Sequence, residues 1–168
     1  MAISYVSPRI EGRHTEGKGH GLFARESIAQ GELLLVWGGF IFDAAGYTAL
    51  TEKQKYQSIM VEEGLYLVNL EEDLGAWINH SCDPNAWLVG QISLFSRREI
   101  KVGEEICFDY GTCVTVSDPI DEFICQCGSP DCRGRLSADD WQDPAFQVRY
   151  AGHFMPYIQR KIDRQQSK

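Results

Sequence analysis

Short apolar runs separated by glycine-rich or polar stretches dominate the first two thirds of the chain. Residues 31–37 and 40–42 are apolar runs of strand length on either side of Gly38 and Gly39. The same pattern recurs at residues 66–70, 86–89, 92–95 and 105–108. Short runs of aliphatic and aromatic side chains bounded by turn residues predict β-strands. Residues 51–59 are polar enough to be a short exposed helix or a loop, and the pattern does not decide between them.

The last part of the chain carries helix signals instead. Residues 137–140 have the Ser-x-x-acid form of a helix N-cap, and Asp143 precedes a proline suited to a first helical turn. Aromatic residues then follow at four-residue intervals: Phe146, Tyr150 and Phe154. This spacing predicts a helix that packs its aromatic side chains on the body of the protein. Gly152 or Pro156 is expected to interrupt it.

The charge of the chain limits the partners that it can hold. At pH 7 its 168 residues carry a formal net charge of -8. Binding to a phosphate backbone needs clustered Lys and Arg, so direct nucleic-acid binding is not expected. Carboxylates gather at residues 62–63, 71–73, 104–105 and 139–140. They either steer a basic peptide toward the protein or form a solvated surface, which is the commoner reason for such clusters.

No targeting or membrane-spanning segment is visible in the sequence. The first residues lack a basic start followed by a sustained apolar run, so no signal peptide is expected. Because every apolar run is shorter than a membrane span, no membrane association is expected either. We therefore expect one domain in an intracellular protein, cytoplasmic by default, with a nuclear location or non-classical export left open.

Three of the six cysteines, Cys125, Cys127 and Cys132, lie within eight residues. In a chain without export signals this spacing indicates metal binding more than a disulfide framework. A closed tetrahedral zinc site takes four ligands, so one thiolate must come from elsewhere. Cys82 is the best candidate, because its turn-forming stretch, residues 77–85, also offers amide, imidazole and hydroxyl groups. Four thiolates would make a structural site with no position for water.

Three further motifs precede the cysteine cluster in a fixed order. Residues 17–24 read GKGHGLFA, residues 79–82 read NHSC and residues 103–110 read GEEICFDY. A glycine-rich turn alone is a weak signal, and the helix of a dinucleotide-binding fold does not follow it. From residue 11 to residue 135 the chain resembles the SET-domain protein-lysine methyltransferases that carry a zinc-binding post-SET segment.

The resemblance implies a mainly β (α+β) fold, a β-clip of several small sheets in which the chain threads through a loop near residues 79–110. Such threading is an exception to the rule against knots. The SET domain would occupy residues 1–115, the linker and post-SET zinc segment residues 116–136, and a tail of short helices residues 137–168. A lysine-containing basic protein or peptide and S-adenosylmethionine would enter from opposite faces and meet at a lysine channel.

The resemblance also implies a cofactor site for S-adenosylmethionine. Its members are Glu16, Gly17, Lys18, Gly19, Tyr66, Trp77, Asn79 and His80. An asparagine amide both donates and accepts hydrogen bonds, as an adenine edge and an amino-acid group require. On the residues alone, Asn79 and His80 could equally satisfy backbone groups at a turn.

Tyr110 is the residue to which the resemblance assigns catalysis. Methyl transfer needs a neutral lysine amine, although a lysine with a pKa of about 10.4 is almost entirely protonated at pH 7. Burial in an apolar channel beside a cationic sulfonium favours the neutral form. A tyrosine hydroxyl at the end of the channel can then align the amine and support the polarised methyl group.

Two more aromatic residues complete the predicted catalytic group. Phe108 stands where the family carries Phe or Tyr, and without a hydroxyl there the amine has room to turn after one methylation. This predicts a capacity for di- or trimethylation. Tyr66 would line the channel, because aromatic walls suit a methylated ammonium. Ordinary strand packing is the alternative role for Tyr66.

Two other interpretations stay open. A non-catalytic scaffold or reader could keep the fold and bind a basic peptide without turnover, although such a protein has no need of an intact Tyr110, Asn79 and His80. A small zinc-ribbon module with an unrelated body would bind its metal without Cys82. Cofactor binding without transfer would favour the first, and zinc binding that survives the loss of Cys82 would favour the second.

Overall fold

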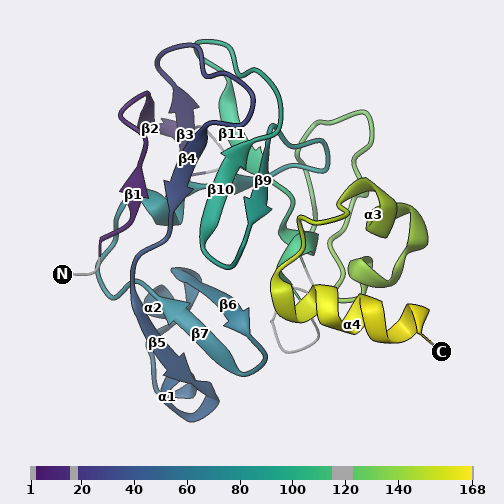
Figure 1. The fold of residues 1–168 in the computed structure, drawn as a ribbon. Coiled ribbons are helices and arrows are strands. Elements are labelled where there is room, and N and C mark those ends of the chain that lie inside the picture. The colour runs from purple at the N-terminus through teal and green to yellow at the C-terminus, as the bar shows by residue number, and fades with distance from the viewer. Residues whose placement is uncertain (1–2, 16–18, 115–122, 168) are drawn as a thin grey trace.

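The described part of the protein contains three small sheets, two short helices next to the third sheet and a group of C-terminal helices (Figure 1). The computed structural model describes residues 3–15, 19–114 and 123–167. The first sheet has the order β1-β4-β10-β9, the second β2-β3-β11-β8 and the third β5-β7-β6. The strands are β1 (Tyr5–Val6), β2 (Ile10–Thr15), β3 (Gly19–Ala24), β4 (Leu33–Val36), β5 (Phe40–Asp43), β6 (Ser58–Glu62), β7 (Leu65–Val68), β8 (Asn79–His80), β9 (Ala86–Val89), β10 (Ser93–Ser96) and β11 (Glu105–Phe108). The predicted mainly β fold of several small sheets is confirmed.

The six apolar runs of the sequence all form strands, namely β4, β5, β7, β9, β10 and β11, with small shifts at their ends. The pattern missed β1, β2, β3, β6 and β8. Strands β2 and β3 mix glycine, histidine and charged residues, yet they pair along their whole length, from Ile10↔Ala24 to Thr15↔Gly19. Pairing with a neighbour, and not an apolar pattern, therefore makes these segments strands.

The undecided polar segment at residues 51–59 contains both a helix and the start of a strand. Helix α2 (Glu52–Tyr56) begins with a capping box, in which Thr51 and Gln54 each bond the other's backbone. Strand β6 follows. Helix α1 (Ala44–Thr48) precedes this segment and was not predicted.

The first helix of the tail starts where the sequence predicts it. Helix α3 spans Pro144–Arg149, and the Asp143 carboxylate accepts from the N–H of Ala145 at 2.8 Å. The helix ends before Gly152, which has a φ of +79°, a conformation that side chains rarely adopt. The cap and the interruption at Gly152 are therefore confirmed.

Two details of the tail differ from prediction. Pro156 begins a second helix, α4 (Pro156–Gln166), because a first helical turn does not need the N–H that proline lacks. The predicted N-cap at Ser137 is wrong: a single 3-10 turn, η3 (Asp140–Gln142), forms there with Asp139 at its N-cap. Among the described residues, every helix is too short or too polar to span a bilayer.

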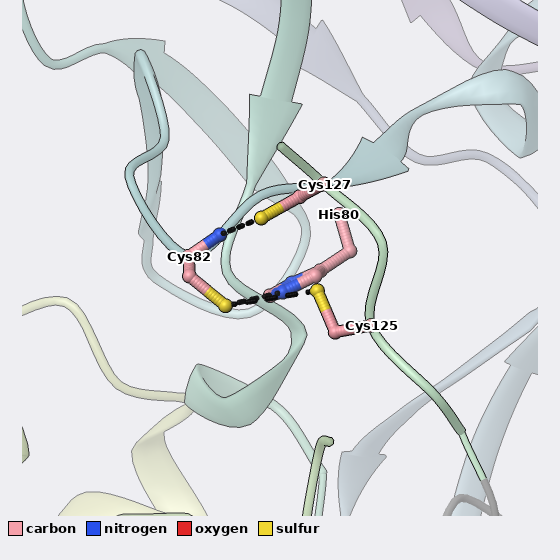
Figure 2. Close-up of side chains that lie close together, drawn as sticks. All are labelled: His80, Cys82, Cys125 and Cys127. Carbon is pink, nitrogen blue, oxygen red and sulfur yellow. Dashed lines mark hydrogen bonds between the residues drawn. The ribbon is translucent and has the colours of Figure 1, made fainter. Parts of the chain in front are cut away.

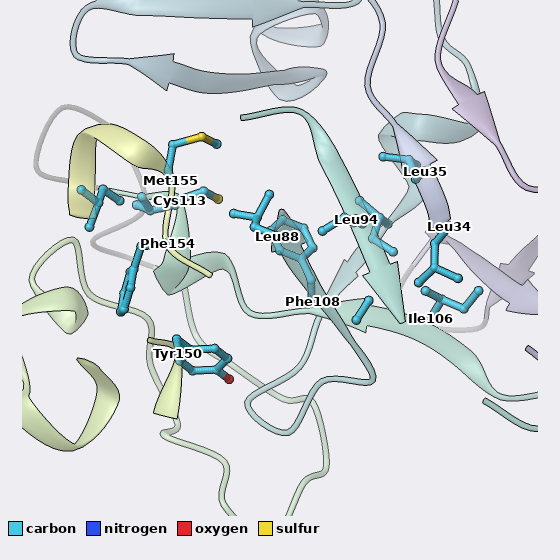
Figure 3. Close-up of a cluster of buried hydrophobic side chains, with 14 of the residues drawn as sticks. Leu34, Leu35, Leu88, Leu94, Ile106, Phe108, Cys113, Tyr150, Phe154 and Met155 are labelled. Atoms are coloured by element: carbon cyan, nitrogen blue, oxygen red, sulfur yellow. The ribbon is translucent and has the colours of Figure 1, made fainter. Parts of the chain in front are cut away.

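One hydrophobic cluster joins the sheets to the tail (Figure 3). It runs from Leu34 and Leu35 on β4 through Phe108 on β11 to Tyr150 and Met155 in the tail. None of these five side chains is more than 3% exposed. Burying a large apolar side chain contributes roughly 1.5–3 kcal/mol, so the tail stabilises the body as the body stabilises the tail. The boundaries at residues 115 and 136 stay predictions, as does the threading near residues 79–110.

Candidate active site

Two of the sequence motifs meet where β8 and β11 run side by side. The strands pair in parallel, with Asn79 opposite Cys107 and His80 opposite Phe108. The backbone N–H of Ser81 donates to the carbonyl of Phe108 at 3.1 Å and continues the pairing. The pair predicted to bind the cofactor therefore lies beside the strand that leads into the predicted catalytic tyrosine.

Tyr110 is held at its backbone and at its hydroxyl. It begins a 3-10 turn, η2 (Tyr110–Thr112). Its N–H donates to Nδ1 of His80 at 3.2 Å, and its hydroxyl donates to the carbonyl of Ile78 at 2.7 Å. Burial raises the pKa of the Tyr110 hydroxyl well above its usual range, so the hydroxyl stays protonated at neutral pH. Because its hydrogen is directed to Ile78, the oxygen lone pairs are left as acceptors.

Aromatic side chains surround Tyr110. The ring centroid of Phe108 lies 5.0 Å away and that of Phe123 lies 6.1 Å away. Trp37 packs on Phe108 with the ring centroids 5.5 Å apart. Phe108 is 3% exposed, whereas Phe123 is 40% exposed. Rings of this kind attract an alkylated ammonium through their faces.

Two predicted site residues take part in stacks that the sequence did not indicate. Tyr66 is buried on β7 in the third sheet and stacks on Tyr47, with the ring centroids 3.8 Å apart. Trp77 ends a 3-10 turn, η1 (Leu74–Trp77), and stacks on His20 at 4.2 Å. Each stack limits the rotation of the predicted residue.

Only part of the predicted cofactor loop can be placed. Glu16, Gly17 and Lys18 lie outside the described residues, so their predicted role is not tested. Gly19 begins β3 with a φ of +80°, a conformation that favours glycine. Among the described residues, its chain neighbours aside, no heavy atom lies within 4 Å of where its Cβ would be, so there is open space on that side of Gly19.

The Asn79 side chain links three strands. Its Nδ2 donates to the carbonyl of His20 at 2.8 Å and to Oε1 of Glu105 at 2.7 Å. A Cβ on Gly21 would lie 2.8 Å from that Glu105 oxygen, so glycine allows β3 to come this close. Both N–H groups of the amide have protein partners. This is what we expect if Asn79 serves to satisfy groups of the protein and not a ligand.

Sulfur atoms from two distant segments gather beside His80 (Figure 2). Sγ of Cys125 lies 3.7 Å from Sγ of Cys82 and 3.6 Å from Sγ of Cys132. The backbone N–H of Cys82 donates to Sγ of Cys127 at 3.5 Å. The donor atoms of His80, Cys82, Cys125 and Cys127 all lie within 4.8 Å of one another. Tetrahedral zinc with Zn–S bonds of about 2.3 Å needs sulfurs about 3.8 Å apart, which these distances fit.

His80 belongs to this group of four donors and Cys132 does not, which differs from the predicted set of four cysteines. Its Nε2 lies 3.2 Å from Sγ of Cys82. Burial lowers the pKa of His80 to about 4, so at neutral pH the imidazole carries a single N–H. Because Nδ1 accepts from the N–H of Tyr110, we assign that hydrogen to Nε2, where it would point at the sulfur. With this assignment Nε2 has no lone pair for a metal, and the four-cysteine ligand set stays a prediction.

Three thiols of the cluster ionise unequally. Burial raises the pKa of Cys82 and of Cys125. Burial also opposes ionisation of Cys127, but hydrogen bonds from the backbone N–H groups of Cys82 and Ser129 lower its pKa to about 6. Cys127 therefore ionises more readily than Cys82 and Cys125. Ionisation of all three thiols needs a nearby cation, which a bound metal ion provides.

A buried ion pair joins the catalytic segment to the cysteine segment. The guanidinium of Arg133 donates to both carboxylate oxygens of Asp109 at 2.7 Å, a bidentate contact. The hydroxyl of Tyr150 donates to the same carboxylate at 2.9 Å, and the N–H of Gly111 donates at 3.0 Å. A second carboxylate, Asp140, lies 3.2 Å from the guanidinium. The buried Asp109 charge therefore has the paired and hydrogen-bonded surroundings that such a charge requires.

Replacing Asp109 by asparagine is expected to lower the free energy of unfolding by about 3 kcal/mol, because Arg133 keeps a largely buried charge that only Asp140 still balances. Urea denaturation should show a lower midpoint with an unchanged slope. The matched control is Glu62→Gln, which removes a partly exposed carboxylate that Arg160 bonds at 2.6 Å, at a cost below about 1 kcal/mol. Equal losses in the two variants would contradict the role of the buried pair.

Sequence reasoning missed Asp109, Arg133, Phe123 and Trp37. Asp109 lies inside the GEEICFDY motif, and Arg133 directly follows the last cysteine of the cluster. The available signal was a carboxylate at the end of an apolar strand and a residue of opposite charge, an arginine, directly after the cysteines. Phe123 lies two residues before the cluster, where a lone aromatic residue gives no pattern. Trp37 ended an apolar run and indicated only packing.

The comparisons with known proteins agree with this arrangement. The profile of a family described as SET domain matches residues 19–111. The chain is 32% identical to the histone-lysine N-methyltransferase ASHH2 of Arabidopsis thaliana over 136 residues, which are 73% of this chain and 8% of that protein. It is also 32% identical over 154 residues to the H3 lysine-36 specific histone-lysine N-methyltransferase of Yarrowia lipolytica, covering 80% of this chain and 19% of that protein. The chain thus spans less than a fifth of the length of these relatives.

Two solved structures share the fold. SUVH6 of Arabidopsis thaliana in complex with SAM has a TM-score of 0.64 at 19% identity, over 79% of this chain and 33% of that one. KRYPTONITE in complex with mCHG DNA and SAH has a TM-score of 0.63 at 21% identity, over 79% of this chain and 30% of that one. At these identities the similarity establishes the arrangement of the strands and helices.

Proposed function

The chain belongs to the SET-domain family, and from that premise we propose that it transfers a methyl group from S-adenosylmethionine to the ε-amine of a protein lysine. The observation that carries the proposal is the protonated hydroxyl of Tyr110, fixed 2.7 Å from the carbonyl of Ile78 beside the paired strands of Asn79 and His80. The histone-lysine N-methyltransferases among its relatives support it.

The chain's own residues would position a neutral amine. Bound S-adenosylmethionine supplies an electrophilic methyl group on a sulfonium. A protonated lysine has no lone pair to attack it, and burial among the rings of Phe108 and Trp37 favours the neutral amine. Because Tyr110 gives its own hydrogen to Ile78, its oxygen can accept an N–H of that amine and orient the lone pair.

Cofactor binding is assigned to the eight residues of the predicted site. They are Glu16, Gly17, Lys18, Gly19, Tyr66, Trp77, Asn79 and His80. Among the described members, the open space beside Gly19 and the stacked indole of Trp77 fit a ligand that combines a flat base with a polar amino-acid group. His80 would act from its backbone, because both nitrogens of its ring are in use.

A structural zinc ion is the second bound group that we propose. Its ligands would be Cys82, Cys125, Cys127 and Cys132. The sulfur of Cys125 lies 3.7 Å from that of Cys82 and 3.6 Å from that of Cys132, and both distances fit an all-thiolate tetrahedron. Such a site has no position for water, so the ion would take no part in the transfer. Its role would be to tie the cysteine segment to the turn that follows Asn79 and His80.

Phe108 is expected to permit more than one methyl transfer to the same lysine. Phe108→Tyr should shift the product toward monomethyl-lysine, because a hydroxyl at this buried position would hold the amine and occupy the space that a methylated amine needs. Mass spectrometry of a lysine peptide at saturating cofactor measures the distribution. Monomethyl-lysine as the only product of the wild type, with no gain in any variant at this site, would contradict the prediction.

The substrate that we propose is a basic, lysine-containing protein, with a histone as the first candidate. The net charge of -8 suits a cationic partner. The relatives named as histone methyltransferases favour a nuclear location, and nothing among them supports the cytoplasmic default. The DNA in the KRYPTONITE complex is a ligand of that protein, and DNA binding by this chain is not part of the proposal.

Incubation of the purified protein with labelled S-adenosylmethionine and core histones, followed by mass spectrometry of lysines, tests the function. Label on lysine is the expected result. Cofactor binding without label on histones or on a wider mixture of basic proteins would favour the non-catalytic scaffold or reader. Zinc content that stays unchanged in Cys82→Ser would favour the zinc-ribbon module instead.

A further inference from the structure

The C-terminal tail reaches the catalytic segment at the carboxylate of Asp109 and at the carbonyls of Thr112 and Cys113. Tyr150, which follows α3 and is 1% exposed, donates its hydroxyl hydrogen to Oδ2 of Asp109 at 2.9 Å. Arg133 grips both oxygens of the same carboxylate, and its guanidinium lies 4.9 Å from the ring centroid of Phe146 on α3. The cysteine segment and the tail therefore fix the Asp109 side chain together.

Asp109 in turn fixes the short turn that carries Tyr110. Its carboxylate accepts from the N–H of Gly111 at 3.0 Å, and its carbonyl accepts from the N–H and the hydroxyl of Thr112 at 3.1 and 2.7 Å. A Cβ on Gly111 would lie 2.9 Å from the ring of Phe146, so this turn is also pressed against the tail. Tyr110 lies between these anchors. A shift of the Asp109 carboxylate would move the hydroxyl of Tyr110.

We propose that Tyr150 is a positioning residue for methyl transfer, which holds Asp109 and through it sets the place of the Tyr110 hydroxyl. The inference rests on the proposed function of Tyr110. Misplacing a reacting group by about 1 Å costs roughly 100-fold in rate, so losing one of several anchors is expected to lower turnover about tenfold. Arg133 still pairs with Asp109 when the Tyr150 hydroxyl is absent, so the loss falls on geometry more than on folding.

Tyr150→Phe tests the proposal, because it keeps the buried ring and removes only the hydroxyl. The matched control is Tyr157→Phe on α4, a 2% exposed tyrosine whose hydroxyl donates to the carbonyl of Cys113 at 3.0 Å. Both variants should lower the Tm by similar amounts. Only Tyr150→Phe should lower kcat, by about tenfold, with the Kd of S-adenosylmethionine and the zinc content unchanged. An unchanged kcat in Tyr150→Phe, or equal losses of kcat in both variants, would overturn the proposal.

Two further measurements separate this inference from the proposed function. Wild-type turnover in Tyr110→Phe would defeat the proposed role of Tyr110, whereas an inactive Tyr110→Phe beside a fully active Tyr150→Phe would defeat the positioning role alone. The backbone amide resonance of Tyr110 reports its placement independently of activity. It should shift in Tyr150→Phe and not in Tyr157→Phe, and an amide that stays in place in Tyr150→Phe would overturn the positioning role.

Discussion

Tyr110→Phe is expected to lower kcat by about 100- to 1000-fold, the range found when one preorganised hydrogen-bonding group is lost from an active site. The phenylalanine ring keeps its contacts with Phe108 and His80, 5.0 and 5.3 Å away. What disappears is the oxygen that, in the proposed mechanism, would accept from the lysine amine and face the transferred methyl group. The loss should therefore appear in kcat, with the Kd of S-adenosylmethionine within about threefold of the wild type.

The measurement is single-turnover methyl transfer to a lysine peptide at saturating cofactor, with the Kd of the cofactor taken from calorimetry. Tyr110→Phe leaves the carbonyl of Ile78 without the hydroxyl, at a cost of about 1 kcal/mol in the free energy of unfolding. Tyr157→Phe loses a comparable buried hydrogen bond and controls for that cost. Turnover in Tyr110→Phe that matches this control would remove the tyrosine from the mechanism.

Removing zinc with a chelator is expected to abolish methyl transfer and to expose residues 123–136 to protease. Zinc binding at sites of this kind supplies apparent free energies of about 10–16 kcal/mol at pH 7, comparable with the whole stability of a typical domain. The affected segment includes Arg133, whose guanidinium holds the carboxylate next to Tyr110. Metal loss should therefore disturb the active site as well as the cysteines. Elemental analysis should show one zinc per chain before chelation.

Single substitutions identify the ligands. Cys82→Ser and Cys132→Ser should each lower the zinc content, whereas Cys107→Ser, a buried thiol outside the cluster, should keep it. His80→Gln should also keep the zinc, because the Nε2 hydrogen of His80 faces the sulfur of Cys82. Zinc lost from His80→Gln and kept by Cys132→Ser would replace the four-cysteine set with one that contains the histidine.

The parts of the fold that the sequence predicts are those whose signal is local. The six apolar runs are strands, and Asp143 caps the helix that it was expected to cap. Strands β2 and β3 were missed because their glycines and histidines carry no alternation, and only the partner strand makes them extended. Pro156 was misplaced for a related reason. A proline can end a helix or begin one, and the choice depends on packing that the sequence does not display.

The candidate site, like the fold, has parts that the sequence predicts and parts that it does not. The resemblance assigned Asn79 and His80 to the cofactor and Tyr110 to the end of the lysine channel, and the structure places the two segments side by side through a strand pairing that was not predicted. The ion pair between Asp109 and Arg133 could not be anticipated, since it depends on how the post-SET segment closes. The tautomer of His80 could not be predicted either, because we assign it from the direction of a single backbone N–H, that of Tyr110.

The contact of Tyr150 with Asp109 also bears on the order in which parts of the protein form during synthesis. Contacts between residues far apart in sequence form late, because the intervening chain must first be ordered. Synthesis runs from the N-terminus, so the strands leading to Tyr110 leave the ribosome before the tail exists. A nascent chain therefore forms the contact between Tyr150 and Asp109 only after Tyr150 has emerged. If Tyr150 positions Tyr110 as we propose, that positioning comes later in synthesis than the strands that lead to Tyr110.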